Sequence, residues 1–506
     1  MDKMSEEIKH NWLRENWIIV GIILIATVIR LYFLWITKNQ TVWWDSAEGL
    51  LYMKHIVLGT PISGFANFRE VIIPYVWAGI YFFFRSEIAI QVFQMIISVL
   101  TVIVVYYLGK TIYDKTTGII ASIMMSVFWL HLFFTYRLLT YLYPPLLYPL
   151  ILLLFYKGYC AENPKDKYLF LSFVTIIVGI GIYSSVVLST LVILLYLFFT
   201  EKFSFLKNKR LWKYGLLSLP FILVSFIPSY LIQGSLLPRL TQMSGAVSQG
   251  TGLGLKGLLV YVTSVPTLIV PIWIGLAILS MLLIIRIFFY SDLILKNIAP
   301  SNVKKDLFIF LGFIVFLGFY TYVAIQVGGF YDGWIISIFP FLFILIARTI
   351  LEIKDYISTK NINYGKSFMM LILIVLAFSC YQQLQFANMT IVNKIPSYYN
   401  LHPAGEWLKE HTNPNETILA SSVPQLTYYS ERNVISFQGP INETFQQAME
   451  RIYLAHPKYL VLTIWERSPE WAYSMPVQLN YTIEKIFYIN PQQPDIVIYE
   501  IKYNGG

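Results

Sequence analysis

The segment Trp43–Glu48 carries the residue types best suited to chemistry, because it places Asp45 and Glu48 within one helical turn, just behind two tryptophans. The segment follows a long apolar stretch, and tryptophan favours the headgroup level of a membrane. Carboxylates so close to hydrocarbon cost free energy and usually serve a function. A carboxylate held at the membrane surface can take a proton from a hydroxyl, as a general base does. Asp45 and Glu48 are therefore the candidate catalytic residues.

Both acids also have a structural interpretation. Asp45 opens a predicted amphipathic helix over residues 45–58, where an aspartate is a good N-cap. Glu48 then stands at the position of a capping-box partner. Capping and catalysis are compatible, since a fixed backbone holds the carboxylate in one place.

The composition indicates an integral membrane protein. Of the 506 residues, 57% are hydrophobic and only 13% are charged, whereas soluble domains carry about 25% charged residues. The net charge of +9 comes from basic residues in short loops between apolar segments, which sets orientation in a membrane and excludes a nucleic-acid-binding surface. The two cysteines, Cys160 and Cys380, fall in a predicted loop and a predicted span, so neither a disulfide nor a metal site is expected.

Apolar segments of roughly 20 residues predict about eleven transmembrane helices. A further apolar segment, 71–84, is shorter, and counting it as a span would put most basic loops outside, against the positive-inside bias. We therefore expect 71–84 to be a juxtamembrane helix in the first outer loop. The predicted spans are 17–36, 88–108, 119–136, 142–156, 168–183, 184–200, 214–232, 266–290, 307–327, 334–350 and 368–387.

This topology predicts a multi-pass protein of the cell membrane with a cytoplasmic N-terminus, and it divides the chain at residue 390. Residues 1–390 form the transmembrane domain, and residues 391–506 form a small extracytoplasmic α/β domain, because short helix-like and strand-like segments alternate there. The helix-like segments are 402–411 and 442–455, the second with Asn442 as N-cap, and the strand-like segments are 417–421, 434–437, 458–464 and 495–501.

Several short motifs resemble those of the protein mannosyltransferase and aminoarabinose transferase family, the family 39-like membrane glycosyltransferases. The likeness covers nearly the whole chain in layout, although each motif is short. The motifs are Arg30-Leu31-Tyr32, Trp43-Trp44-Asp45, Tyr52-Met53, Phe68–Pro74, Tyr136–Leu139 followed by Pro144, and Ala404–Leu408 with Ile418–Ser421.

The resemblance implies the GT-C fold and an inverting transfer of a sugar from a polyprenyl phosphate, dolichyl or undecaprenyl, to an acceptor hydroxyl on the extracytoplasmic face. Dolichyl phosphate mannose and protein glycosylation are the family's typical donor and process. The acceptor is a protein, a lipid or a glycan, membrane lipids surround the site, and no cofactor is implied. Inverting hydrolases need an acid and a base, but a lipid phosphate leaves as a stable anion, so Asp45 alone suffices as the base.

A departing phosphate needs positive charge, and arginine offers planar bidentate contacts to phosphate oxygens. Arg137, Arg69 and Arg239 lie in predicted outer loops and are the candidate phosphate-binding residues. Their alternative roles are interfacial snorkelling and contacts to lipid headgroups. Arg30, inside the first span, is expected to snorkel outward, and contact with a bound phosphate is its alternative role.

The chain also departs from the family pattern. Family members usually have Asp-Glu where this chain has Asp45-Ser46, often carry an acid near Thr140–Tyr141, and have Arg-Tyr near the last outer loop. That loop here contains Tyr331 and Asp332, which become candidates for contacting the acceptor or another loop. A turn residue is the alternative interpretation of Asp332.

Two other functions remain open from the sequence. A transporter or lipid flippase would normally show paired halves and acids at mid-membrane, whereas the predicted spans are nearly free of Asp and Glu. A non-catalytic subunit of a surface-glycan assembly complex is the third possibility.

Overall fold

The computed structural model describes residues 2–66, 69–236, 268–296, 298–327, 331–439 and 443–503. The chain forms two compact units. The helical unit comprises residues 1–35, 92–136 and 140–390, and the mixed unit comprises residues 36–91, 137–139 and 391–506. The two-domain division at residue 390 stays a prediction.

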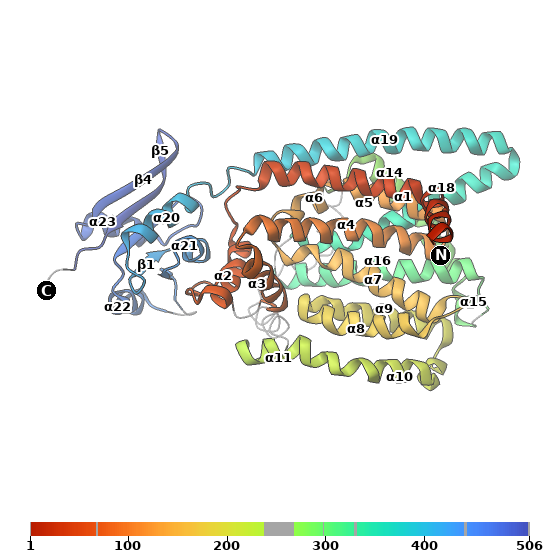
Figure 1. Cartoon of the computed structure of the whole chain (residues 1–506), viewed down its shortest axis with the longest axis horizontal. Coiled ribbons are helices and arrows are strands. Elements are labelled where there is room, and N and C mark those ends of the chain that lie inside the picture. Colours follow the sequence, from red (N-terminus) through yellow and green to blue (C-terminus); the bar gives the residue numbers. More distant parts are fainter. Residues whose placement is uncertain are drawn as a thin grey trace. The chain divides into compact units, whose positions relative to one another are not determined.

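The helices of the helical unit run alongside one another in Figure 1, and α1, α4 and α19 extend at one end into residues of the mixed unit. They are α1 (Asp2–Thr37), α4 (Glu87–Ile112), α5 (Lys115–Val127), α6 (Trp129–Thr135), α7 (Pro144–Phe155), α8 (Asp166–Ile182), α9 (Leu188–Glu201), α10 (Lys209–Ser218), α11 (Ile222–Gln233), α14 (Pro271–Phe289), α15 (Ser291–Leu295), α16 (Ser301–Val327), α17 (Asp332–Ile335), α18 (Phe339–Lys360) and α19 (Ile362–Asn393).

The predicted polytopic helical architecture is confirmed. In the described ranges, eight helices are long and apolar enough to cross a membrane, and α5 with α6 makes a ninth candidate that is bent by 55°. The predicted spans 142–156 and 168–183 are also helical, as α7 with the π-turn Tyr156–Cys160 and as the 17-residue α8. Segment 71–84 forms α3 (Ile72–Phe84), which at 13 residues is shorter than a span, as expected of a juxtamembrane helix.

The bend between α5 and α6 is held by polar side chains from two other spans. A break inside an apolar bundle frees backbone groups that need new partners. Arg30 Nη1 donates to the carbonyl of Ser126 at 3.0 Å, and Arg30 Nη2 lies 3.1 Å from His131 Nδ1. On the other side of the break, the amide of Trp129 donates to Gln383 Oε1 at 3.1 Å. The prediction that Arg30 snorkels outward is wrong, because its side chain is fully buried where the break supplies acceptors.

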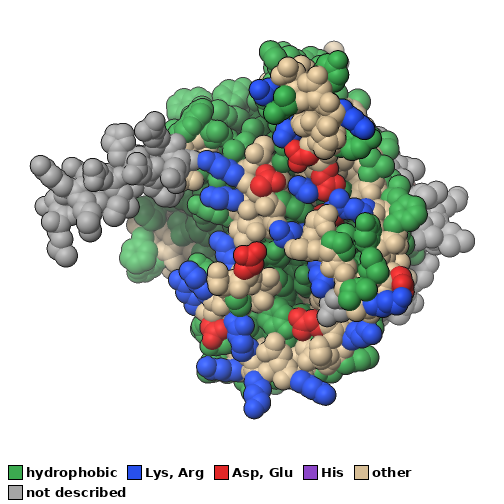
Figure 2. All heavy atoms as spheres, turned by 90° about the vertical axis from the view of Figure 1, so that its right-hand side faces the viewer, with side chains coloured by type: hydrophobic (Ala, Val, Ile, Leu, Met, Phe, Trp, Pro, Cys, Tyr) green, Lys and Arg blue, Asp and Glu red, His purple; other side chains and the backbone are tan. Residues whose placement is uncertain are grey.

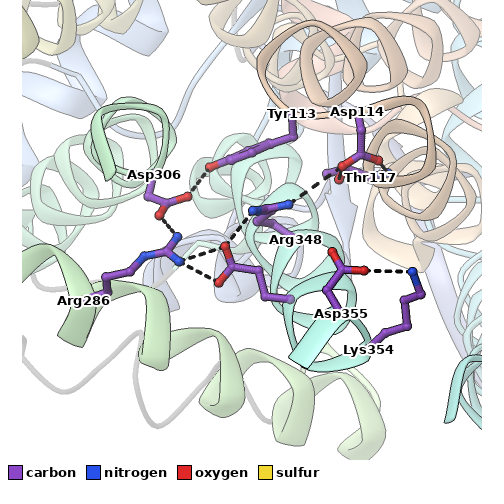
Figure 3. A network of polar contacts seen from close by, with 9 residues as sticks. Tyr113, Asp114, Thr117, Arg286, Asp306, Arg348, Lys354 and Asp355 are labelled. Carbon is purple, nitrogen blue, oxygen red and sulfur yellow. Dashed lines mark hydrogen bonds and ion pairs between the residues drawn. The ribbon is translucent and has the colours of Figure 1, made fainter. Parts of the chain in front are cut away.

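One end of the helical unit is strongly basic. Figure 2 views the end that carries α15 in Figure 1 and shows lysine and arginine side chains spread across it. Within this end, Arg286 from α14 contacts Asp306 of α16 and lies 2.8 Å from Glu352 of α18. Arg348 of α18 contacts the same Glu352 at 2.7 Å and Asp114, the N-cap of α5, at 3.9 Å (Figure 3). The network therefore ties four helices together.

We expect Arg286→Met to destabilise the protein by about 3–5 kcal/mol, because it leaves the fully buried Asp306 without its cation. Replacing both partners by apolar residues, as in Arg286→Met with Asp306→Leu, should recover most of the loss. Thermal unfolding of the detergent-purified protein measures both effects. Lys296→Met, which removes an exposed ion pair with Asp292, is the control. A double variant no more stable than the single variant would contradict this account.

The mixed unit contains a five-stranded sheet in the order β2-β1-β3-β5-β4. Strands β1, β2 and β3 are parallel, and β5 runs antiparallel to both β3 and β4. The strands are β1 (Thr417–Ala420), β2 (Asn433–Ile435), β3 (Tyr459–Thr463), β4 (Thr482–Asn490) and β5 (Gln493–Glu500), and the helices are α2 (Trp44–Leu58), α3, α20 (Leu401–His411), α21 (Val423–Ser430), α22 (Phe445–Ala455) and α23 (Glu470–Gln478).

Helices cover both faces of this sheet, so the predicted α/β class of the tail is confirmed. Ile418 of β1 packs with α20 and α21 on one face, and the next residue, Leu419, packs with α22 and α23 on the other, as the two-residue period of a strand requires. The start of α22 differs from the prediction. Asn442 lies outside the described residues, and Thr444 is the N-cap, in a capping box with Gln447.

The segment between α1 and α4 packs on the C-terminal segment within the mixed unit. Helix α2 contacts α3 and α21. Lys54 of α2 forms a 3.2 Å ion pair with Glu431 and lies 4.2 Å from the ring centre of Tyr428. The backbone amide of Val42, ahead of α2, donates to the hydroxyl of Tyr429 at 2.9 Å. These contacts hold α2 against α21 from both of its ends, and the two candidate acids lie at its beginning.

Candidate functional site

Asp45 lies in the first turn of α2 but does not cap it. The N-cap is Trp43, with extended backbone and no side-chain capping bond, so the predicted N-cap role of Asp45 is wrong. The capping-box role of Glu48 is wrong as well, because its carboxylate accepts from Trp44 Nε1 at 2.8 Å and from Arg69. Both acids therefore bind other side chains and do not cap the helix. The dipole at the helix N-terminus also favours the negative charge of Asp45.

Arg69 joins the two acids into one charge cluster. Arg69 Nη2 lies 2.6 Å from Asp45 Oδ1, and Arg69 Nε lies 2.6 Å from Glu48 Oε2. The side chain of Glu48 is 3% exposed, whereas that of Asp45 is 31% exposed. With two carboxylates around one guanidinium, Asp45 is the acid that an incoming hydroxyl can reach.

Asp45 and Glu48 lie in different electrostatic environments, because Glu48 is more deeply buried. Burial raises the pKa of Glu48 above its ordinary value, and the charge and hydrogen bond of Arg69 only partly offset that rise. Glu48 is thus a buried group that holds Arg69 and Trp44 in place. Asp45, on the accessible side of Arg69, has the geometry of a proton acceptor.

Arg137, in the segment between α6 and α7, contacts the start of α2 beside this cluster. The hydroxyl of Ser46 donates to the backbone carbonyl of Arg137. The guanidinium carbon of Arg137 lies 4.0 Å from the ring centre of Trp43, in cation–π contact, and the residue is only 5% exposed. Ser46 therefore links this segment to α2. Four predicted site residues, Asp45, Glu48, Arg69 and Arg137, come together in the mixed unit.

The other candidates lie elsewhere. Tyr331 and Asp332 belong to the helical unit, where Tyr331 is the N-cap of α17 and its ring lies 5.0 Å from that of Tyr141. Two positions where the chain departs from the family pattern thus contact each other. Arg239, and Phe68 of the proline-containing motif, lie outside the described residues.

Several residues at the site were not predicted. Trp44 binds Glu48, and Tyr398, from the segment before α20, places its ring 6.2 Å from that of Trp43. No local pattern marks Tyr398, because 355 residues separate it from Trp43 in the sequence. Across the described residues, no group of three His, Cys, Asp or Glu side chains is placed to hold a metal ion. Cys160 and Cys380 are free thiols.

Comparison with known proteins places this geometry in context. Residues 71–229 match the family described as dolichyl-phosphate-mannose-protein mannosyltransferase. No curated protein sequence matches the chain.

Solved structures resemble the whole chain. ArnT from Cupriavidus metallidurans bound to undecaprenyl phosphate superposes with a TM-score of 0.61 at 10% identity, over 96% of this chain and 98% of that one. The oligosaccharyltransferase AglB from Archaeoglobus fulgidus, in complex with an inhibitory peptide and a dolichol-phosphate, gives a TM-score of 0.59 at 12% identity, over 95% and 74%. The arabinofuranosyltransferase AftD from Mycobacteria gives 0.57 at 13% identity, over 96% and 40%.

The predicted resemblance is confirmed at the level of the fold. The chain has the GT-C fold of membrane glycosyltransferases and is a multi-pass membrane protein.

Proposed function

We propose that this protein is a membrane glycosyltransferase that moves a sugar from a polyprenyl phosphate to an acceptor hydroxyl on the extracytoplasmic face. One observation carries the proposal. A partly exposed carboxylate, Asp45, is fixed by Arg69 at the start of a juxtamembrane helix, with the buried Arg137 anchored beside it. The fold is shared with a structure that binds undecaprenyl phosphate and one that contains a dolichol-phosphate.

In the proposed reaction, Asp45 accepts the proton of the acceptor hydroxyl while the hydroxyl oxygen bonds to the anomeric carbon of the donor sugar. The bond between that carbon and the lipid phosphate oxygen breaks, and the phosphate leaves with the electron pair. Attack opposite the leaving group inverts the anomeric configuration. The lipid phosphate is a stable anion and needs no proton, so a single base balances the reaction.

Arg69 and Arg137 have different roles in the proposed reaction. Arg69 is engaged by both acids, so it keeps Asp45 oriented and also offers charge toward a donor phosphate. Arg137 is the main candidate for holding that phosphate, because a guanidinium matches its oxygens in a bidentate way. A phosphate role for Arg239 and an acceptor contact by Tyr331 and Asp332 stay predictions.

We place the site on the outer face because of charge asymmetry. The basic end of the helical unit (Figure 2) includes the start of α10 and the connection between α18 and α19 (Figure 1), and the segments 202–213 and 354–366 there are rich in lysine and arginine. Cytoplasmic segments between spans are enriched in these residues. In this orientation the N-terminus is cytoplasmic. Residues 391–506 are then extracytoplasmic.

The deciding experiment incubates the purified chain, reconstituted in lipid nanodiscs, with membrane extract and radiolabelled donors. Dolichyl-phosphate mannose and undecaprenyl-phosphate sugars are the probes. The proposal expects label to appear in a covalent product whose anomeric configuration is inverted. Substrate-dependent flux in liposomes without any product would instead favour a transporter. Transfer that requires added partner proteins would favour an assembly subunit.

A further inference from the structure

The turn that follows β3 brings a second acidic and aromatic group to the mixed unit. Strands β1 and β3 are parallel neighbours, so their carboxyl ends meet at one edge of the sheet, the edge where α/β folds usually bind ligands. Trp465 and Glu466 lie just after β3, and their backbone amides both donate to Thr463 Oγ1 at 3.2 and 3.3 Å. The hydroxyl of Thr463 is in turn 3.4 Å from that of Ser422, just after β1.

Tyr398 connects this turn to the candidate site. Its ring centre lies 5.2 Å from that of Trp465 and 6.2 Å from that of Trp43. Tyr398 has a φ of +64°, a left-handed conformation that is costly for an aromatic residue and needs support from its surroundings. A row of contacts therefore begins at Arg137, passes through Trp43 and Tyr398, and ends at Trp465. Asp45 lies two residues after Trp43 in the sequence, so the row starts close to the proposed base.

Glu466 adds a carboxylate beside Tyr398 in this row of contacts. The hydroxyl of Tyr398 donates to Glu466 Oε1 at 3.4 Å. Burial, together with the charges of Glu466 and Asp45, raises the pKa of Tyr398 to about 12, which keeps this hydroxyl a neutral donor. The indole nitrogen of Trp465 is buried without a hydrogen-bond partner among the residues that the structure describes. A buried N–H without a partner costs free energy, and a hydrogen bond to a bound acceptor atom would remove that cost.

We propose that Tyr398, Trp465 and Glu466, with Trp43, form the acceptor subsite, and that the acceptor is a glycan that presents a neutral sugar ring. This inference rests on the proposed transfer reaction and specifies its acceptor. A sugar offers an apolar C–H face to aromatic rings and hydroxyls at its edge, and a carboxylate accepts strong hydrogen bonds from hydroxyls.

The same chemistry disfavours the other acceptor classes. Glu466 and Asp45 together repel an anionic acceptor such as a phosphorylated lipid headgroup. A serine or threonine in a peptide supplies one hydroxyl and no ring for the aromatic row. Arg137 contacts Trp43, whereas Trp465 contacts Tyr398, so the proposed phosphate contact and the turn after β3 lie at the two ends of this row of contacts.

The test measures transfer by the full-length protein in nanodiscs with one labelled donor and three acceptors: a neutral oligosaccharide, a Ser/Thr peptide and an anionic glycolipid. We expect the oligosaccharide to be preferred. Glu466→Gln and Tyr398→Phe should each raise the KM for the oligosaccharide about tenfold, the effect of one lost hydrogen bond, with the donor KM unchanged. Glu470→Gln and Tyr399→Phe are matched controls, since both side chains are exposed outside the row.

Preference for the peptide or the anionic lipid would overturn the inference, as would a Glu466→Gln variant that behaves like Glu470→Gln. If the wild-type protein transfers no sugar to any acceptor, the proposed function fails. Binding of the neutral oligosaccharide to the full-length chain then decides the subsite separately. Binding weakened by Glu466→Gln and not by Glu470→Gln supports the subsite, and equal or absent binding overturns it.

Discussion

We expect Asp45→Asn to abolish measurable sugar transfer while the protein remains folded and abundant. A general base contributes about 10²- to 10⁴-fold to a rate, and asparagine cannot accept the acceptor's proton. The fall should appear in kcat with little change in the KM for the donor, because the phosphate contacts stay in place. Glu48 keeps its 2.6 Å contact to Arg69 in this variant, so the cluster retains its anchor.

The measurement is single-turnover transfer from a radiolabelled polyprenyl-phosphate sugar by the purified variant. Asp292→Asn removes a carboxylate from an exposed ion pair on α15 and serves as the control that should keep full activity. Transfer at the wild-type rate by Asp45→Asn would remove Asp45 from the mechanism. Loss of activity together with a lower unfolding temperature would instead assign the residue a structural role.

We expect Arg137→Met to lower kcat/KM for the donor by about 10²- to 10³-fold, the usual effect of losing one group that stabilises developing negative charge. Arg137→Lys retains the charge but loses the planar fork, so we expect it to recover only part of the activity. The backbone carbonyl that accepts from Ser46 is unaffected by either change. The two variants therefore separate charge from geometry at one position.

Initial rates across a donor concentration series, at saturating acceptor, provide the readout for Arg137. Arg467→Met is the control, because that side chain is 85% exposed. Equal loss in the Met and Lys variants would show that the planar guanidinium, rather than its positive charge alone, carries the effect. Unchanged donor kinetics in the Met variant would exclude Arg137 from the donor site.

The sequence predicts what depends on local patterns. Apolar segments of sufficient length predict the candidate spans, and the charge of the loops predicts that α3 is juxtamembrane. Strand β4 was missed because most of its side chains are exposed, so it lacks the apolar alternation that marks a half-buried strand. The N-cap of α2 was misassigned because the residue type that favours capping, Asp45, is drawn instead to Arg69.

The site itself depends on contacts between distant residues. Asp45 and Arg69 are 24 residues apart, and Ser46 and Arg137 are 91 residues apart. Residue types and predicted topology place these groups on one face of the membrane, which suffices to nominate them. Which of these groups contact each other depends on the packing of loops, and no periodic sequence pattern specifies a loop conformation. The contacts of Arg69 with both Asp45 and Glu48 therefore follow from the structure and not from the sequence.

The buried guanidinium of Arg30 has a consequence for biosynthesis. Arg30 enters the bilayer with the first span, yet its partner His131 is made 101 residues later, which takes about 5–20 s at ordinary rates of translation. An arginine at the centre of an inserting helix costs about 2.5–3.5 kcal/mol on insertion scales. The nascent chain therefore carries a guanidinium that lacks its contacts to Ser126 and His131 until the bent span arrives. We expect membrane integration of this protein to depend on assistance during that interval.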